Sequence, residues 1–121
     1  MKLEELRIYN QADQLSDEIW ELVDKWTYFQ KDTIGKQLVR SADSISANIA
    51  EGYGRYFYKE NRNFCYYSRG SLLETKNWLA KSARRKLIPV KQYALLDSKL
   101  DELHKSLNAY INAINKQSSE S

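Results

Sequence analysis

Apolar residues recur along almost the whole chain at intervals of three and four, the spacing of one face of an α-helix. The first such segment spans residues 3–28, where the apolar positions follow a heptad pattern and acidic residues fill the other faces. Its apolar positions are Ile8, Ala12, Leu15, Ile19, Leu22 and Trp26. We expect a helix over residues 3–28, with Asp32 or Thr33 capping the helix that follows.

The second segment, residues 37–55, reads QLVRSADSISANIAEGYGR and organises the rest of the chain. Leu38, Ala42, Ile45 and Ile49 share one helical face, and most of their neighbours are serine or alanine. Small side chains allow close helix contacts, so this segment is expected to be the central helix. The pair Gly52 and Gly54 is expected to stop it, since glycine accepts the left-handed conformation that closes a helix.

Two further helices are predicted over residues 58–83 and 90–115, separated by Pro89, which cannot continue a helix. The inward side of the third helix is expected to carry Phe64, Ser68, Ser71, Thr75, Trp78 and Ser82, with Leu72 and Leu79 flanking them. The fourth has heptad positions at Tyr93, Leu96, Leu100, Leu103, Leu107, Tyr110 and Ile114. Four amphipathic helices with short connections predict an all-α, antiparallel up-down four-helix bundle. We expect one domain over residues 1–115 and a short polar tail over residues 116–121.

Composition agrees with a single domain, because 121 residues with 42% hydrophobic content can bury one core. No apolar run reaches the roughly 20 residues that a membrane span needs. The single cysteine, Cys65, cannot form an internal disulfide, which fits a reducing cytoplasm. We therefore expect a cytoplasmic protein without a membrane partner.

Basic residues are concentrated between positions 53 and 91, where ten of them stand against two acidic residues. This segment carries a net charge of +8 and the remainder of the chain carries −5, which together give the overall net charge of +3. Arg62, Tyr66, Arg69, Leu73 and Lys76 form a heptad stripe expected to lie opposite the buried side of the third helix. Basic groups interleaved with aromatic rings suit a nucleic acid, since cations pair with phosphates and rings stack on bases.

Two other interpretations of this basic segment remain open: a solvated cationic face, or a face that meets the acidic first helix of a neighbouring subunit. If nucleic acid is the ligand, RNA is favoured. The residues expected to contact it are Arg62, Tyr66, Arg69, Lys76, Arg84, Arg85 and Lys86.

A polar row lies beside the apolar face of the central helix and is here called the polar seam. Its members are Arg40, Ser44, Asn48 and Glu51, together with Glu74 of the third helix. We hypothesise an Arg40–Glu74 or an Arg40–Glu51 charge contact, with Asn48 satisfying the remaining groups. Such a contact would fix the alignment of the helices, because buried polar groups must be paired.

Catalytic and metal-binding patterns are not supported. Di-metal helical bundles need a Glu-x-x-His motif from each of two helices, whereas Asp101-x-x-His104 is the single comparable pair here. Cys65 is expected to be a small buried hydrophobic residue rather than a nucleophile. Gly52 and Gly54 follow no strand, so they are not expected to form a phosphate-binding loop. We therefore expect a protein that is not an enzyme and needs no metal or cofactor.

Several large apolar residues fall beside or outside the strict heptad positions, namely Trp20, Val23, Leu73, Leu95 and Ile111. A monomeric bundle would leave several of them as an exposed apolar patch, which usually marks an interface. This pattern favours a homo-oligomer, although it does not give the number of subunits.

Residues 37–55 resemble the signature of the bacterial four-helix-bundle family that includes the 23S rRNA intervening-sequence proteins. Tyr58-Lys59-Glu60-Asn61 and the segment RGSLLET at residues 69–75 resemble a second block of that family. The resemblance covers about residues 5–115. One departure is Ser46, where many members carry proline or glycine, so no break in the central helix is required here.

The resemblance implies a compact four-helix bundle assembled into a homopentameric ring. Genes of this family are often encoded in intervening sequences within 23S rRNA genes. A related branch, the accessory variability determinant of diversity-generating retroelements, binds nucleic acid and a reverse transcriptase. The expected function is a non-enzymatic nucleic-acid-binding or scaffolding oligomer. The alternative is a protein–protein adaptor that docks an acidic partner such as a reverse transcriptase.

Overall fold

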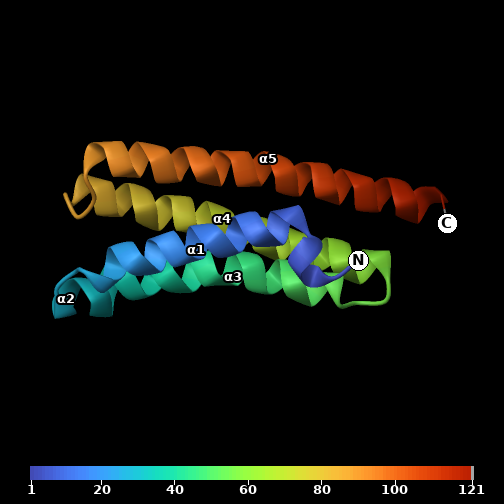
Figure 1. Cartoon of the computed structure of the whole chain (residues 1–121), viewed down its shortest axis with the longest axis horizontal. Helices are drawn as coiled ribbons and strands as arrows, with labels where there is room; N and C mark the ends of the chain where they lie inside the picture. Colours follow the sequence, from blue (N-terminus) through green and yellow to red (C-terminus); the bar gives the residue numbers. More distant parts are fainter. Residues whose placement is uncertain (121) are drawn as a thin grey trace.

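The computed structural model describes the backbone of residues 1–120 and the side chains up to Ser118. Four long helices form it: α1 (Arg7–Asp24), α3 (Lys36–Tyr53), α4 (Tyr58–Arg84) and α5 (Val90–Glu120). Short elements precede α1 and α3, namely the 3-10 helix η1 (Leu3–Glu5), one turn α2 (Tyr28–Gln30) and the π-helix η2 (Lys31–Gly35). Figure 1 shows the long helices lying side by side along one axis. The all-α four-helix prediction is confirmed, and the described residues include no strand.

Interhelical hydrogen bonds join α4 to both α3 and α5. Along α4, Ser68 Oγ donates to the Ile45 carbonyl at 2.8 Å, and the Thr75 hydroxyl lies 3.0 Å from that of Ser41. Partners on α3 therefore move back along the chain as α4 advances. The bond from Arg62 to Asn115 and that from Arg69 to Asn108 show the same relation between α4 and α5.

The first connection differs from the prediction because the helix cap lies earlier than expected. α1 ends at Asp24, and Thr27 starts the next helical segment through a capping box with Gln30. Asp32 forms an ion pair with Lys36 instead of capping, and the Thr33 hydroxyl donates to the Phe29 carbonyl. Helical backbone then continues through η2 into α3 without a break.

The core is one continuous apolar cluster to which all four long helices contribute. α1 and α3 bury the predicted faces except for Trp26, which follows the end of α1 and is half-buried. Val23 and Ile111 are buried although they lie outside the strict heptads. On α4 the buried face is rotated from the predicted one, since Leu72 and Leu79 lie at its centre rather than at its flanks. Phe64, Ser71 and Trp78 are only half-buried. The complete buried face of α4 is Cys65, Ser68, Leu72, Thr75, Leu79 and Ser82.

Gly52 allows α3 and α4 to touch at backbone distance. A Cβ at Gly52 would lie 2.8 Å from Asn61 Oδ1, 2.9 Å from Phe64 Cβ and 3.0 Å from the Asn61 carbonyl oxygen. The expected left-handed helix stop is wrong, because no glycine among the described residues has a positive φ and Gly54 has a φ of −77°. Gly52 is therefore required for close packing, not for chain reversal.

The end of α5 also lies beyond the prediction, since this helix continues past Asn115 to Glu120. α3 is unbroken at Ser46, which is buried and donates its hydroxyl to the Asp43 carbonyl at 3.3 Å. Serine at this position therefore keeps the central helix continuous.

We expect Gly52→Ala to lower the free energy of unfolding by about 1–3 kcal/mol, because the added methyl group collides with α4 backbone. Gly70→Ala is the matched control, since its Cβ would meet no atom within 4 Å. It should raise stability by about 0.5–1 kcal/mol, because alanine favours a helix interior. Urea denaturation followed by circular dichroism measures both changes, and equal effects of the two variants would contradict the packing role of Gly52.

Candidate nucleic-acid interface

Three cations of the predicted basic stripe form a regular ladder with α5. Arg62 Nη1 donates to Asn115 Oδ1 at 3.0 Å, and Arg69 Nη1 donates to Asn108 Oδ1 at 2.9 Å. Lys76 forms ion pairs with Asp97 at 3.3 Å and with Asp101. Both sides of this ladder advance in steps of seven residues.

The ladder changes the interpretation of the stripe. Its three cations are half-buried between α4 and α5, so the expectation that they lie opposite the buried side of α4 is wrong. The hydrogen bond from Lys76 lowers the pKa of Asp101, and Asp101 raises the pKa of Lys76 in return. Tyr66 is exposed, but the Arg69 guanidinium lies over its ring at 5.1 Å. The three ladder cations, Arg62, Arg69 and Lys76, therefore serve first to hold α4 against α5.

The partners on α5 were missed by sequence reasoning. A signal for them existed, because Asp101, Asn108 and Asn115 are themselves spaced by seven residues beside the apolar heptad of this helix. Two polar rows with the same period on consecutive helices indicate a polar contact between those helices.

The remaining predicted cations, Arg84, Arg85 and Lys86, are exposed where α4 ends and the connection to α5 begins. We call these three residues the basic loop. Among the described residues, none of the three forms an ion pair. Their charges are therefore available to an external anion.

The backbone of the basic loop is tightly held. The Leu87 amide donates to the Ser82 carbonyl at 2.9 Å, and the Lys86 amide donates to the Ala83 carbonyl at 3.0 Å. These bonds make a Schellman motif, in which Lys86 takes the left-handed position with a φ of 62°. Burial of Ile88 fixes the chain that follows. The loop thus presents three cations from a defined backbone.

The polar seam is assembled differently from the hypothesis. Glu51 forms an ion pair with Arg55 at 2.6 Å, and Glu74 accepts a hydrogen bond from Trp78 Nε1 at 3.0 Å. Arg40 is exposed and forms no ion pair among the described residues, although it lines a small hollow together with Glu74. Neither hypothesised charge contact is present.

The two remaining seam residues bond locally. Ser44 donates to the Arg40 carbonyl at 2.8 Å, and Asn48 donates to the Ser44 carbonyl at 2.9 Å. The register of the helices is fixed instead by the buried hydroxyls between α3 and α4.

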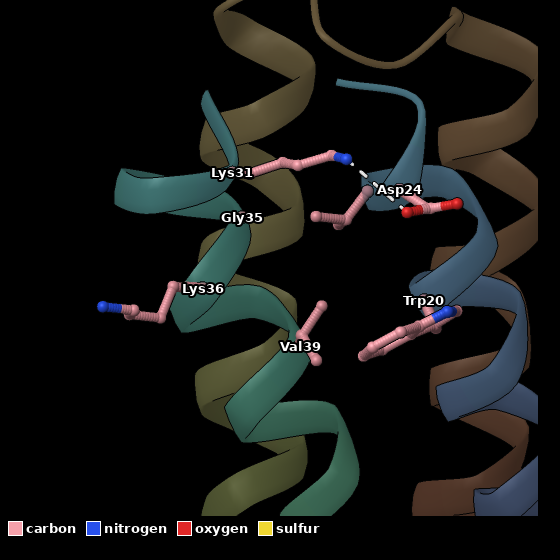
Figure 2. Close-up of a pocket in the computed structure, with 7 residues that line it drawn as sticks. Trp20, Asp24, Lys31, Gly35, Lys36 and Val39 are labelled. Carbon is pink, nitrogen blue, oxygen red and sulfur yellow. Dashed lines mark hydrogen bonds and ion pairs between the residues drawn. The ribbon is translucent and has the colours of Figure 1, made fainter. Parts of the chain in front are cut away.

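A shallow apolar notch of about 200 Å³ lies between the end of α1 and the start of α3. Figure 2 shows Trp20 and Val39 on opposite sides of it, while Lys31 reaches across toward Asp24 and Lys36 points away. The Lys31–Asp24 ion pair spans 3.5 Å, and Trp20 is 59% exposed. The notch can receive an apolar side chain.

Cys65 is buried, and burial raises the pKa of its thiol to about 11. A thiol with such a pKa stays protonated at neutral pH and is a weak nucleophile. This finding agrees with the interpretation of Cys65 as a small hydrophobe.

None of the helices in the described part of the chain is long and apolar enough to cross a membrane.

The geometry thus defines an all-α helical bundle with an exposed basic loop. A model of the 23S rRNA-intervening sequence protein family matches residues 4–109, and the chain belongs to that family. This finding confirms the resemblance seen in the signature segments.

A solved structure supports the same assignment. The chain is similar to the crystal structure of a protein with unknown function from the S23 ribosomal protein family of Bacteroides thetaiotaomicron. The TM-score is 0.81 at 25% sequence identity, and the alignment covers 87% of this chain and 95% of the other. No curated protein matches this chain.

Asp43 of α3 lies within electrostatic range of two carboxylates of α1. Partial desolvation raises the pKa of the Asp43 carboxyl above its ordinary value, and Asp17 and Asp13 of α1 raise it further. A raised folded-state pKa means that ionised Asp43 opposes folding at neutral pH, and that this penalty disappears once the carboxyl is protonated.

We expect Asp43→Asn to raise the free energy of unfolding at pH 7 by about a few tenths of a kcal/mol, and the melting temperature with it. The gain should vanish near pH 3, below the ordinary pKa of 3.8, because the carboxyl is then neutral in both states. Asp32→Asn is the control and should not stabilise, since it removes the ion pair with Lys36. Thermal melts across this pH range test the idea, and a gain that persists at pH 3 would contradict it.

Proposed function

We propose that this protein is a non-enzymatic, RNA-binding scaffold that contacts phosphates through the basic loop. The observation that carries the proposal is the position of Arg84, Arg85 and Lys86, exposed, without ion pairs among the described residues, and held by a Schellman turn. Lysine and arginine that meet phosphates release counterions, which supplies affinity without sequence specificity. The family's description, which refers to a 23S rRNA intervening sequence, favours RNA as the ligand.

We assign the main phosphate contacts to the basic loop because Arg62, Arg69 and Lys76 already form hydrogen bonds or ion pairs with α5. Charge reversal at those three ladder positions would also disturb the packing of α4 against α5. Variants of the basic loop avoid this problem, since its side chains carry no interhelical ion pair in the described part of the chain.

We further propose that the chain forms an antiparallel up-down bundle that assembles into a homo-oligomer, a pentameric ring if the family resemblance holds. Support comes from large apolar side chains that the single chain leaves exposed, including Trp20, Leu73 and Leu95. Assembly would multiply the basic loop, so weak contacts could sum by multivalency. Light scattering of the purified protein gives the number of subunits.

The RNA proposal is tested by fluorescence anisotropy with a labelled RNA duplex at several salt concentrations. We expect wild-type binding to weaken steeply with salt. The combined variant Arg84→Ala, Arg85→Ala, Lys86→Gly should bind more weakly and reduce the salt slope by about one for each cation lost. Glycine is chosen at Lys86 because it accepts the left-handed backbone.

The matched control is Lys2→Ala, Arg7→Ala, Lys105→Ala, which removes the same charge from exposed positions outside the loop. It should leave the slope close to that of the wild type. Equal losses of RNA affinity in both triple variants would mean that binding follows the net charge of the protein alone, which would contradict a specific role for the loop. Absence of binding at low salt would overturn the RNA proposal and leave the loop for an acidic protein partner.

A further inference from the structure

A second candidate site lies at the other end of the bundle, where α3 passes into α4. It is a pocket of about 330 Å³, bounded by the end of α3, the connecting loop, the start of α4 and the last third of α5. Figure 1 shows this connection at the end of the bundle opposite the basic loop. Its lining is dominated by the aromatic residues Tyr53, Tyr56, Phe57, Tyr58 and Tyr110.

Three of these rings are uncovered in the single chain. Tyr56 is 91% exposed, Phe57 is 63% exposed and Tyr58 is 44% exposed. Tyr56 and Phe57 meet edge to face, with centroids 4.9 Å apart and an angle of 83° between their planes. In this pair the edge of one ring covers one face of the other, and the remaining ring surface is exposed beside the hollow, as at a binding site.

The inner wall of the pocket is fixed by polar contacts. Asn61 Nδ2 donates to the Tyr110 hydroxyl oxygen at 3.2 Å, and the Tyr53 hydroxyl donates to the Met1 carbonyl. Arg55, which also lines the pocket, is held by Glu51 at 2.6 Å and lies 4.0 Å from Glu60. The uncovered rings therefore stand beside a wall that is already organised.

The lining combines ring faces with groups that read the edge of a base. The Gln117 amide offers donors and an acceptor, and the Tyr110 hydroxyl can donate because its oxygen already accepts from Asn61. Burial raises the pKa of Tyr110, so it keeps its proton at neutral pH. Unpaired bases are recognised in this manner, by stacking on aromatic side chains and by hydrogen bonds to their edges.

Other occupants fit the chemistry less well. An aromatic cage for a quaternary ammonium would use the ring faces but none of the amide and hydroxyl groups that also line this pocket. A proline-rich segment could also lie against tyrosine rings, but it would use few of the donors and acceptors that Gln117 and the Tyr110 hydroxyl offer.

We propose that this pocket binds one unpaired base of a single-stranded nucleic acid, stacked on the face of one ring of the Tyr56–Phe57 pair with the other ring at its edge. The inference rests on the proposed RNA-binding function but concerns a separate site. Arg55 is neutralised by Glu51 and Glu60, so binding here depends on stacking and less on salt than binding at the basic loop.

The test uses two fluorescein-labelled RNAs of equal length, one unpaired and one fully paired, at low and moderate salt. At moderate salt, the wild-type protein should retain the unpaired RNA and lose the duplex. Tyr56→Ala with Phe57→Ala should weaken binding of the unpaired RNA by about tenfold, given the usual contribution of base stacking. The same variant should bind the duplex at low salt as the wild type does.

The control is Tyr67→Ala, an exposed tyrosine of α4 that does not line the pocket, and it should bind both RNAs normally. Unchanged binding of unpaired RNA by the Tyr56→Ala, Phe57→Ala variant would overturn the pocket while leaving the basic-loop proposal intact. Failure of the wild type to bind either RNA would remove both proposals. Binding of a proline-rich decapeptide that is lost in the Tyr56→Ala, Phe57→Ala variant would assign the pocket to a peptide.

Discussion

The contact between α3 and α4 is the constraint on which the rest of the structure depends. Gly52 lets the backbone of α3 approach Asn61 and Phe64, and the Ser68 hydroxyl bonds to the Ile45 carbonyl within the same interface. A close helix pair with a fixed register also determines where the next helix can pack. α5 then lies along the side of α4 that carries the ladder cations, and its residue Tyr110 completes the aromatic pocket.

Charge has two roles in this molecule, and the structure separates them. Cations on the side of α4 are paired with amides and carboxylates of α5, where they give the bundle a polar contact beside its apolar core. Cations on the basic loop have no such partners among the described residues and remain available to solvent. Net charge alone would have treated both groups as one binding surface.

Periodicity in the sequence was sufficient to predict the four long helices and most of the core, whereas the family was predicted from the resemblance of the segments at residues 37–55 and 69–75. Periodicity gave the period of each helix but not its rotation, so the α4 stripe was placed toward solvent although Arg62 and Arg69 face α5. Gly52 was read as a helix stop, because contact between two backbones leaves no periodic signal. The aromatic pocket combines residues as distant as Tyr56 and Gln117, which only the tertiary structure brings together.

The length of α4 has a geometric consequence for any ligand. This helix contains 27 residues, so the basic loop and the aromatic pocket are separated by roughly 40 Å. Two packed neighbours support α4 along its length, which makes the separation a fixed spacing rather than a variable one. The bundle would therefore act as a molecular ruler: a nucleic acid engaged at both ends must present its paired and unpaired regions at that distance, and shorter molecules could occupy only one end.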